Sequence, residues 1–189
     1  MTGPVGVVAI QGDFEKHIDS LLRAGAEQIV EVRTAEDLSF VERLILPGGE
    51  STTVGKLMSR FGLGAAIQER SSQGMPIWGT CMGMIMMARQ VDQGNQYSLG
   101  ILDIEVHRNA FGAQVHSFED DVHVLGFDRP FVGVFIRAPV VTSTGPGVEV
   151  LATYDDKVVA VRQGTLIGTS FHPELTGDIR LHAWFLDLK

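Results

Sequence analysis

The sequence predicts an α/β protein built around a parallel β-sheet. Short apolar runs alternate along the chain with segments whose apolar residues recur at the helical spacing of three and four. This alternation of strand and helix is typical of parallel sheets that are covered by helices. A glycine-flanked turn around Cys81 joins an apolar run to a Met-rich segment, and it indicates where such a sheet would carry chemistry.

Length and composition set the limits on what the chain does. Its 189 residues and 44% hydrophobic content fit one globular domain, residues 1–189, with a sizeable core. A net charge of −8 without a basic cluster argues against nucleic acid as a partner. The single cysteine excludes an intramolecular disulfide, and the sequence shows neither a signal-peptide pattern nor a membrane-spanning apolar segment. We therefore expect a cytoplasmic protein.

The first half of the chain reads as three strands with helices between them. Residues 5–10 predict a buried strand, residues 11–13 a turn, and residues 28–32 and 43–46 two further strands. Asp13 is the expected N-cap of the first helix. The apolar face of that helix is expected to consist of Phe14, Ile18, Leu21 and Leu22.

A Gly-Gly loop, Pro47-Gly48-Gly49-Glu50-Ser51-Thr52, follows the third strand. Two consecutive glycines let the backbone approach a ligand, and open α/β sheets bind ligands at the carboxyl ends of their strands. An ordinary strand-to-helix turn fits the pattern equally well. Ser51 or Thr52 is the expected cap of a helix whose apolar face holds Val54, Leu57, Met58 and Phe61. The Gly-Lys-Ser/Thr ending of a phosphate-binding loop and a Gly-x-Gly-x-x-Gly after the first strand are both absent, so neither nucleotide site is expected.

The turn at Cys81 resembles a nucleophile elbow. Gly79 and Gly83 flank the cysteine at positions i−2 and i+2, and larger side chains there would block both the turn and a substrate. The helix predicted at residues 82–90 would favour a thiolate at its N-terminus and lower the pKa of the thiol. A buried cysteine that only fills apolar space is the alternative, and a catalytic role requires a base elsewhere in the chain.

The second half of the chain changes character. Residues 97–118 are mixed, and short apolar runs follow at residues 132–136, 148–154, 157–162 and 166–170. The last three runs predict an antiparallel meander attached to the parallel sheet. The chain closes on a helix with an apolar side made of Leu181, Trp184, Phe185 and Leu188.

His172 is the candidate base. It ends the last run, Pro173 fixes the chain after it, and Glu174 would point the same way in an extended segment and hold the imidazole. Cys81, His172 and Glu174 would then be nucleophile, base and orienting carboxylate. A capped turn with a surface carboxylate is the alternative. The other histidines lack the spacing of a metal site, with His17 expected on a solvated helix face, His182 in the last helix, and His107, His116 and His123 in the irregular middle.

Together, Gly79-Thr80-Cys81-x-Gly83 and His172-Pro173-Glu174 resemble the class I (triad) glutamine amidotransferases. Within that family the chain is similar, over nearly its whole length, to glutaminase subunits of pyridoxal 5′-phosphate synthase. The similar blocks are Val7-Val8-Ala9-Ile10-Gln11-Gly12, the Gly-Gly loop, Arg108-Asn109-Ala110-Phe111-Gly112, Phe135-Ile136-Arg137-Ala138-Pro139 and His172-Pro173-Glu174-Leu175-Thr176. The resemblance implies a three-layer flavodoxin-like sandwich whose mostly parallel central sheet carries an antiparallel extension.

The resemblance also implies the reaction, which is hydrolysis of L-glutamine to glutamate and ammonia by Cys81, His172 and Glu174. It places the substrate contacts at Gly49, Glu50, Ser51, Arg108, Ile136 and Arg137. It places the oxyanion hole at Gly48, Gly49 and Met82, joined by Gln11 once the partner docks. No metal or cofactor is implied for this chain. The implied partner is a separate (β/α)₈-barrel synthase subunit with a dodecameric core, which receives the ammonia.

The chain departs from the family pattern at Met82, His107 and Ala113, and none of these residues belongs to the triad. Two other functions remain open at this point. One is a glutaminase subunit of another synthase, such as imidazole glycerol phosphate or anthranilate synthase, which should lack the block that begins at Arg108. The other is a flavodoxin-like binding or redox-sensing module in which Cys81 is only oxidisable. The His172–Glu174 pair argues against the sensor, because a sensor needs no orienting carboxylate.

Overall fold

The computed structural model describes residues 3–92, 97–108, 110–111 and 117–188, apart from the side chains of Ser51 and Thr52. Its helices are α1 (Phe14–Arg23), α2 (Ala35–Ser39), α3 (Ser51–Arg60), α4 (Leu63–Ser72), α5 (Met82–Met87) and α6 (Arg180–Leu186), with the 3-10 helix η1 at Pro173–Leu175. Its strands are β1 (Val5–Val8), β2 (Ile29–Val32), β3 (Arg43–Leu46), β4 (Ile77–Thr80), β5 (Ala88–Val91), β6 (Leu102–His107), β7 (Ser117–Val122), β8 (Phe131–Ile136), β9 (Val140–Thr144), β10 (Glu149–Tyr154), β11 (Lys157–Gln163) and β12 (Leu166–Thr169).

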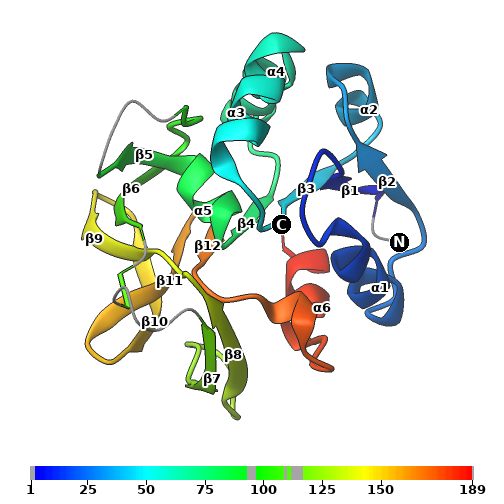
Figure 1. The fold of residues 1–189 in the computed structure, drawn as a ribbon. Coiled ribbons are helices and arrows are strands. Elements are labelled where there is room, and N and C mark those ends of the chain that lie inside the picture. Colours follow the sequence, from blue (N-terminus) through cyan, green and yellow to red (C-terminus); the bar gives the residue numbers. More distant parts are fainter. Residues whose placement is uncertain (1–2, 93–96, 109, 112–116, 189) are drawn as a thin grey trace.

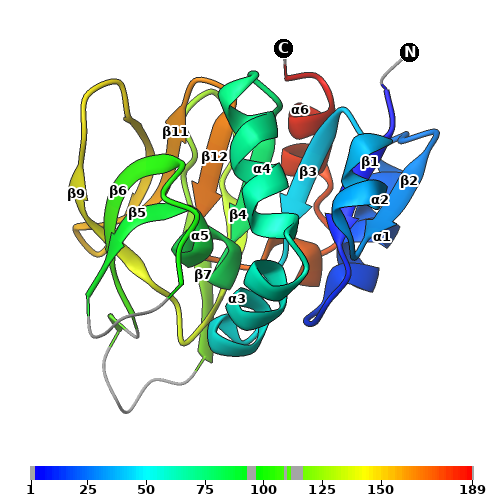
Figure 2. The same cartoon turned by 90° about the horizontal axis from the view of Figure 1, so that it is seen from above.

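A mixed sheet forms the centre of the molecule. Its strand order is β2-β1-β3-β4-β12-β11-β9-β6-β5, with β10 paired to β11, and β7 and β8 form a separate hairpin. The strands from β2 to β12 pair in parallel, in the order 2-1-3-4-5 of flavodoxin-like sheets. Figure 2 shows β5, β6 and β9 gathered at the end of the molecule away from β1 and β2. The predicted α/β fold with an antiparallel extension is confirmed, and the predicted meander is β10-β11-β12.

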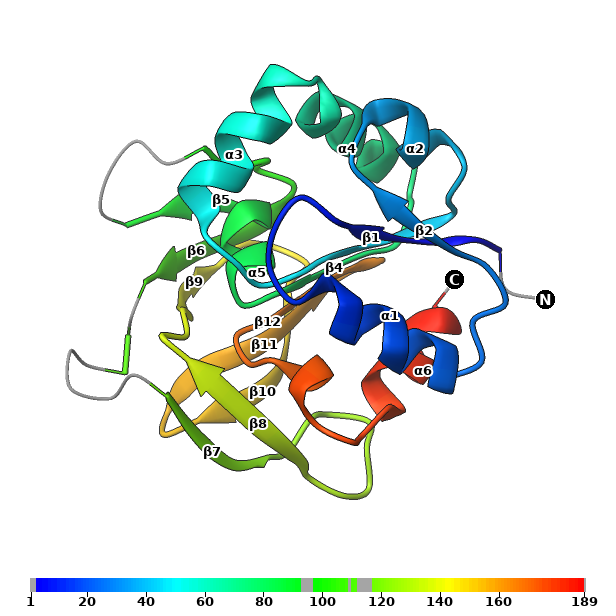
Figure 3. The same ribbon diagram turned by 45° about the vertical axis from the view of Figure 1, so that its right-hand side comes forward.

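Helices cover both faces of the parallel strands (Figures 1 and 3). The helices α1 and α6 lie side by side on one face, and α2 to α5 cover the other. Side chains of one strand alternate between these layers, so that Val5 and Val7 of β1 pack with α1 and α6, whereas Val8 packs on the opposite face. Trp78 and Ile77 of β4 divide in the same way. Both faces of these strands are apolar because both are buried, as is usual in parallel sheets.

The parallel strands bring their following loops to one edge of the sheet. The carboxyl ends of β1, β3, β4 and β12 are neighbours, because these strands pair in sequence across the sheet. The strand order also reverses at β1, which has β2 on one side and β3 on the other. Open α/β sheets bind ligands at such a reversal point. The turn after β1, the Gly-Gly loop, Cys81 and His172 therefore meet at one place.

The helix after Cys81 is shorter than predicted. It ends at Met87, and Ala88–Val91 forms β5 beside β6 instead of continuing the helix to residue 90. The last carbonyl groups of α5 are satisfied by the segment that leads into β6. Leu99 N donates to Met86 O at 2.7 Å and Ile101 N donates to Met87 O at 3.0 Å. Strand pairing with residues distant in sequence has thus overridden the helix propensity of the methionines.

Asp13 takes the expected N-cap position of α1, although its side chain makes no capping hydrogen bond. Predictions about three residues on helix faces are wrong. Leu22 and Phe61, which were expected on apolar faces, are each 58% exposed. His17, which was expected in solvent, is completely buried. A short helix, α2, was not predicted, although Thr34 and Asp37 form a capping box at its start.

The last helix is tied to the centre of the sheet. The buried guanidinium of Arg43 in β3 donates to Phe185 O at 2.9 Å and to the carbonyl of Leu186. A cation at a helix C-terminus satisfies carbonyl groups that have no partner within the helix. This contact ties the C-terminus of α6 to β3. In the described part of the chain, no helix has the length and apolar character needed to cross a membrane.

Candidate active site

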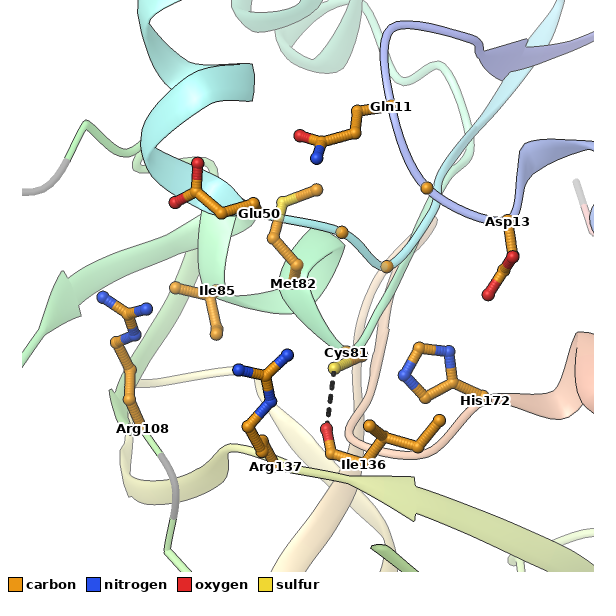
Figure 4. A pocket seen from close by; sticks show the side chains of 13 residues that line it. Gln11, Asp13, Glu50, Cys81, Met82, Ile85, Arg108, Ile136, Arg137 and His172 are labelled. Carbon is orange, nitrogen blue, oxygen red and sulfur yellow. Dashed lines mark hydrogen bonds between the residues drawn. The ribbon is translucent and has the colours of Figure 1, made fainter. Parts of the chain in front are cut away.

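A cavity of about 420 Å³ opens at the carboxyl ends of β1, β3 and β4. Figure 4 shows Cys81 in this cavity between the side chains of Arg137 and His172. The cavity is lined by Gln11, Gly12, Asp13, Gly48, Gly49, Glu50, Cys81, Met82, Ile85, Arg108, Ile136, Arg137 and His172. Segments that are far apart in the sequence thus contribute to one polar site.

Cys81 stands at a strained turn between β4 and α5. Its backbone angles are φ 49° and ψ −107°, a conformation that costs a non-glycine residue on the order of 1–3 kcal/mol. A backbone hydrogen bond to the neighbouring strand β12 fixes the turn, because Cys81 N donates to Thr169 O at 2.7 Å. The thiol Sγ lies 3.8 Å from Ile136 O at the cavity wall. Strain of this kind is common at sites where one side chain must be presented to a ligand.

The two glycines of the elbow are required by close packing. A Cβ atom on Gly79 would lie 2.5 Å from the carbonyl carbon of Gly83, and a Cβ on Gly83 would lie 1.9 Å from Leu46 O. The absence of a side chain at Gly79 lets α5 pack closely against β4, and its absence at Gly83 lets α5 pack closely against β3. Glycine at both positions therefore lets the helix start directly beneath the thiol.

His172 and Glu174 meet through a turn. His172 is held by its backbone N–H, which donates to Val134 O of β8 at 2.8 Å, and the chain then enters η1. His172 Nδ1 lies 2.7 Å from Glu174 Oε1, within this turn. The expected contact is present, but the expected extended segment is not. Pro173 starts the 3-10 helix, and the tight turn brings the carboxylate back under the imidazole.

The charges of these groups stabilise one another. Burial by itself would lower the pKa of His172, but hydrogen bonds to Cys81 and Glu174 outweigh it and raise the pKa to about 10. Burial by itself would raise the pKa of the Glu174 carboxyl, yet nearby His17 and His172 hold this pKa below its usual value. At neutral pH the imidazole therefore carries a proton and the carboxylate is ionised. The thiol, the imidazole and the carboxylate form one consecutive chain of contacts.

The Gly-Gly loop lies against the turn after β1. A Cβ on Gly48 would lie 2.5 Å from His172 Cε1, so a side chain there would strike the imidazole. Gly12 has φ 95°, and a Cβ on it would lie 1.8 Å from Gly48 O. Gln11 and Met82 line the same side of the cavity. The backbone of the Gly-Gly loop is thus held between the imidazole and the turn that carries Gln11.

The far wall of the cavity, on the side away from His172, carries Glu50 and Arg108, whereas Arg137 lies nearer to Cys81 (Figure 4). Glu50 Oε2 accepts hydrogen bonds from Thr53 N at 2.9 Å and Thr53 Oγ1 at 2.5 Å, so Glu50 caps α3 in place of the predicted Ser51 or Thr52. Arg108 and Arg137 both line the cavity, and Arg137 has φ 45°. Ser51 belongs to α3, but its side chain lies outside the described residues, as do Asn109, Gly112, Ala113 and His116.

The site predicted from the sequence did not include His17, His182 and Thr80, which are completely buried. His17 lies next to Glu174, and His182 and Thr80 lie next to His17. A signal for His17 was present in the helix pattern. Phe14, His17, Ile18 and Leu21 are spaced i, i+3, i+4 and i+7, which is the spacing of a buried helix face. His107 instead pairs with Asp92 at the surface. Among the described residues no group of three or more His, Cys, Asp or Glu side chains could hold a metal ion.

Comparisons with known proteins agree on one family. The model of the SNO glutamine amidotransferase family matches residues 7–188. Pyridoxal 5′-phosphate synthase subunit PdxT of Herpetosiphon aurantiacus is 53% identical and covers 97% of this chain and 99% of its own, and the subunit of Methanothrix thermoacetophila is 48% identical over 97% and 98%. A solved glutamine amidotransferase is 50% identical, with a TM-score of 0.93 and 97% of each chain covered. A putative GMP synthase subunit of Thermoplasma acidophilum shares the fold alone, at 16% identity and a TM-score of 0.67, with 98% of this chain and 94% of its own covered.

Proposed function

The chain belongs to the SNO glutamine amidotransferase family, and we propose that it is the glutaminase subunit of a pyridoxal 5′-phosphate synthase. One observation carries the catalytic part of this proposal. The only thiol of the chain, an imidazole and a carboxylate follow one another in direct contact at the wall of a polar cavity. A redox sensor needs no carboxylate behind its histidine. Relatives with about half of their residues identical are named as subunits of this synthase, which favours it over other synthases.

In the acylation step Cys81 attacks the side-chain amide of L-glutamine. The thiolate Sγ forms a bond to the amide carbon, and the carbonyl oxygen takes up the negative charge. That oxygen lies beside the backbone of Gly48, Gly49 and Met82, where hydrogen-bond donors stabilise developing charge. The imidazolium of His172 gives its proton to the amide nitrogen, the carbon–nitrogen bond breaks, and ammonia leaves. The product on the enzyme is a γ-glutamyl thioester.

In the second step water releases glutamate. His172, now neutral, accepts a proton from the water molecule as its oxygen attacks the thioester carbon. The carbon–sulfur bond breaks and the thiolate is restored beside the imidazolium. Glu174 holds the ring by its Nδ1–H during both steps, so that the other ring nitrogen faces the thiol.

Recognition of the amino acid end of glutamine falls to the far wall of the cavity. Arg108 supplies a fork of N–H donors that fits the α-carboxylate, and Glu50 supplies a carboxylate for the α-ammonium group. Because Glu50 also caps α3, its carboxylate keeps a fixed position. Further substrate contacts are assigned to Gly49, Ser51, Ile136 and Arg137.

The ammonia is used by a partner. We assign that role to a (β/α)₈-barrel synthase subunit, which forms a dodecameric core in the cytoplasm. The barrel docks on the side of the cavity that carries Gln11 and Gly12. Docking reorients the Gly-Gly loop and adds Gln11 to the oxyanion hole, since glycine changes its backbone conformation at little steric cost. The chain then hydrolyses glutamine rapidly only when it is bound to the subunit that uses the ammonia.

The proposed function is tested by glutamine hydrolysis with and without the barrel subunit. Removal of one oxyanion donor costs on the order of 10²–10³ in kcat, so docking is expected to raise kcat by up to that factor. Glutamate release is measured at saturating glutamine as purified barrel subunit is added. A chain that is as fast alone as in the complex would refute the docking switch. A chain that is inactive in both conditions would refute the glutaminase assignment.

The contact between Gly12 and the Gly-Gly loop allows a matched test. Gly12→Ala places a methyl group against Gly48 O and should displace the oxyanion loop, whereas Gly25→Ala has the same strain at φ 96° with nothing within 4 Å. Displacements near 1 Å cost about 10²-fold in catalysis, so we expect a loss of about 10- to 100-fold in kcat for Gly12→Ala only. Both variants are assayed in the complex. Equal activities in the two variants would remove Gly12 from the control of the loop.

A further inference from the structure

A buried polar cluster lies behind the triad and has no part in the steps above. It consists of His17 on α1, His182 on α6 and Thr80 on β4, and each of these residues is 0% exposed. The helices that carry the two histidines lie side by side (Figure 3), and α1 also packs against η1. Burying three polar side chains together is costly unless each finds a hydrogen-bond partner.

His17 connects the carboxylate of the triad to the protein interior. Its Nε2 lies 3.3 Å from Glu174 Oε2 and 3.2 Å from Thr80 Oγ1. Its Nδ1 lies 3.0 Å from His182 Nε2. Glu174 Oε1 faces His172, so the two carboxylate oxygens have different histidine neighbours. In the described part of the chain Oε2 has no well-aligned donor, and the imidazole nitrogen that approaches it is His17 Nε2.

The protons of this cluster can be placed from the contacts. Glu174 is an acceptor, so His17 Nε2 must carry the proton that faces it, because a lone pair there would repel the carboxylate. A neutral His17 then accepts at Nδ1 from His182 Nε2–H. The remaining His182 Nδ1 has no partner among the described residues, and in this arrangement it is a bare lone pair. The opposite arrangement would bury an N–H without an acceptor.

The surroundings favour neutral rings in this pair. Trp78 packs against both, with its ring centroid 6.0 Å from that of His17 and 5.0 Å from that of His182. Burial lowers the pKa of His17, and it lowers the pKa of His182 to about 3. The charged or titratable groups that face the cluster from all sides are Asp13, Arg23, His172, Glu174 and Asp178. Among these groups Glu174 has the largest effect on the pKa of His17 and raises it, but burial outweighs this effect.

We propose that His17 is a positioning residue, whose neutral imidazole donates its Nε2–H toward Glu174 Oε2 and keeps this carboxylate ionised and turned toward His172. The chain of contacts then runs from His182 through His17, Glu174 and His172 to Cys81. The catalytic consequence rests on the proposed glutaminase function, whereas the arrangement of protons does not.

Two substitutions separate this role from simple packing. His17→Leu fills the space without a donor, and His17→Gln keeps an N–H near the position of Nε2. Loss of the hydrogen-bond partner behind a metal-ligating side chain typically costs 10–100-fold. By analogy we expect a fall in kcat of about that size for His17→Leu, which removes the partner behind Glu174, with KM changed less than about twofold. His17→Gln should recover most of the lost activity. Without the donor the pKa of Glu174 rises, so the acid limb of the kcat/KM profile moves to higher pH.

The control is Leu21→Ala, one turn further along α1 and equally buried. It should lower the melting temperature and leave the acid limb in place. All three variants are assayed in the complex with the barrel subunit. An unchanged acid limb in His17→Leu, or equal losses in the Leu and Gln variants, would overturn the positioning role.

The wild-type protein offers a test that needs neither variants nor turnover. Nitrogen-15 NMR of labelled histidines should show His17 and His182 as neutral Nε2–H tautomers between about pH 6 and 8. A charged His17, or an Nδ1–H tautomer, would overturn the proposal even if glutamine is hydrolysed. Inactivity toward glutamine together with the expected tautomers would instead refute the proposed function and leave the proton arrangement standing.

Discussion

Replacement of Cys81 with alanine is expected to abolish glutamine hydrolysis and to leave the fold intact. Cys81 carries the only thiol of the chain, and no other group on the cavity wall can form the thioester. In enzymes of this kind loss of the nucleophile costs about 10⁴-fold or more in kcat. The turn itself should persist, because its hydrogen bond to Thr169 O uses the backbone of residue 81.

The measurement is steady-state release of glutamate by the complex with the barrel subunit, with thermal unfolding as the control for the fold. The Cys81→Ala substitution should also change the pKa of His172. Without the thiolate, His172 loses one of the partners that raise its pKa to about 10, so its pKa should fall. Wild-type turnover by a folded Cys81→Ala protein would end the assignment of the nucleophile.

Loss of His172 is expected to be nearly as damaging as loss of Cys81. The two side chains act as one unit, and effects within such a unit do not add. An electrophilic glutamine analogue with a diazoketone side chain provides a direct readout, because it alkylates the thiolate. It should label Cys81 far more slowly in His172→Asn than in the wild-type chain. Glu174→Gln should lie between them, since Glu174 orients the ring and does not react.

The control for this experiment is the labelling rate after unfolding, where the thiol has no neighbours and all variants should agree. In the folded proteins, equal rates for wild type and His172→Asn would mean that His172 does not activate the thiol.

Much of the site follows from local sequence. The elbow glycines were recognisable by spacing, and the structure supplies the reason, since any Cβ at Gly79 or Gly83 would collide with backbone. The meeting of four loops at one sheet edge follows from the parallel order of β1, β3, β4 and β12. Such features can be predicted from the sequence because the residues in contact lie within a few positions of one another or are brought together by the fold class.

The features that the sequence did not predict depend mostly on contacts between residues far apart in the chain. His17 is buried because His182, 165 positions away, and Thr80, 63 positions away, complete its environment. The helix after Cys81 stops at Met87 because β6 pairs with the next residues. The His172–Glu174 contact was expected from an extended segment and arises instead from a 3-10 turn. In the first two cases tertiary packing overrode the local preference, whereas in the third a local turn at Pro173 did so.

Trapping the covalent intermediate tests the proposed chemistry most directly. The complex of this chain with the barrel subunit is supplied with L-glutamine, quenched in acid during turnover, digested and examined by mass spectrometry. We predict a γ-glutamyl group on the peptide that contains Cys81 and none in the Cys81→Ala complex. A γ-glutamyl group on any other residue, or undiminished glutamate release by the Cys81→Ala complex, would contradict the mechanism.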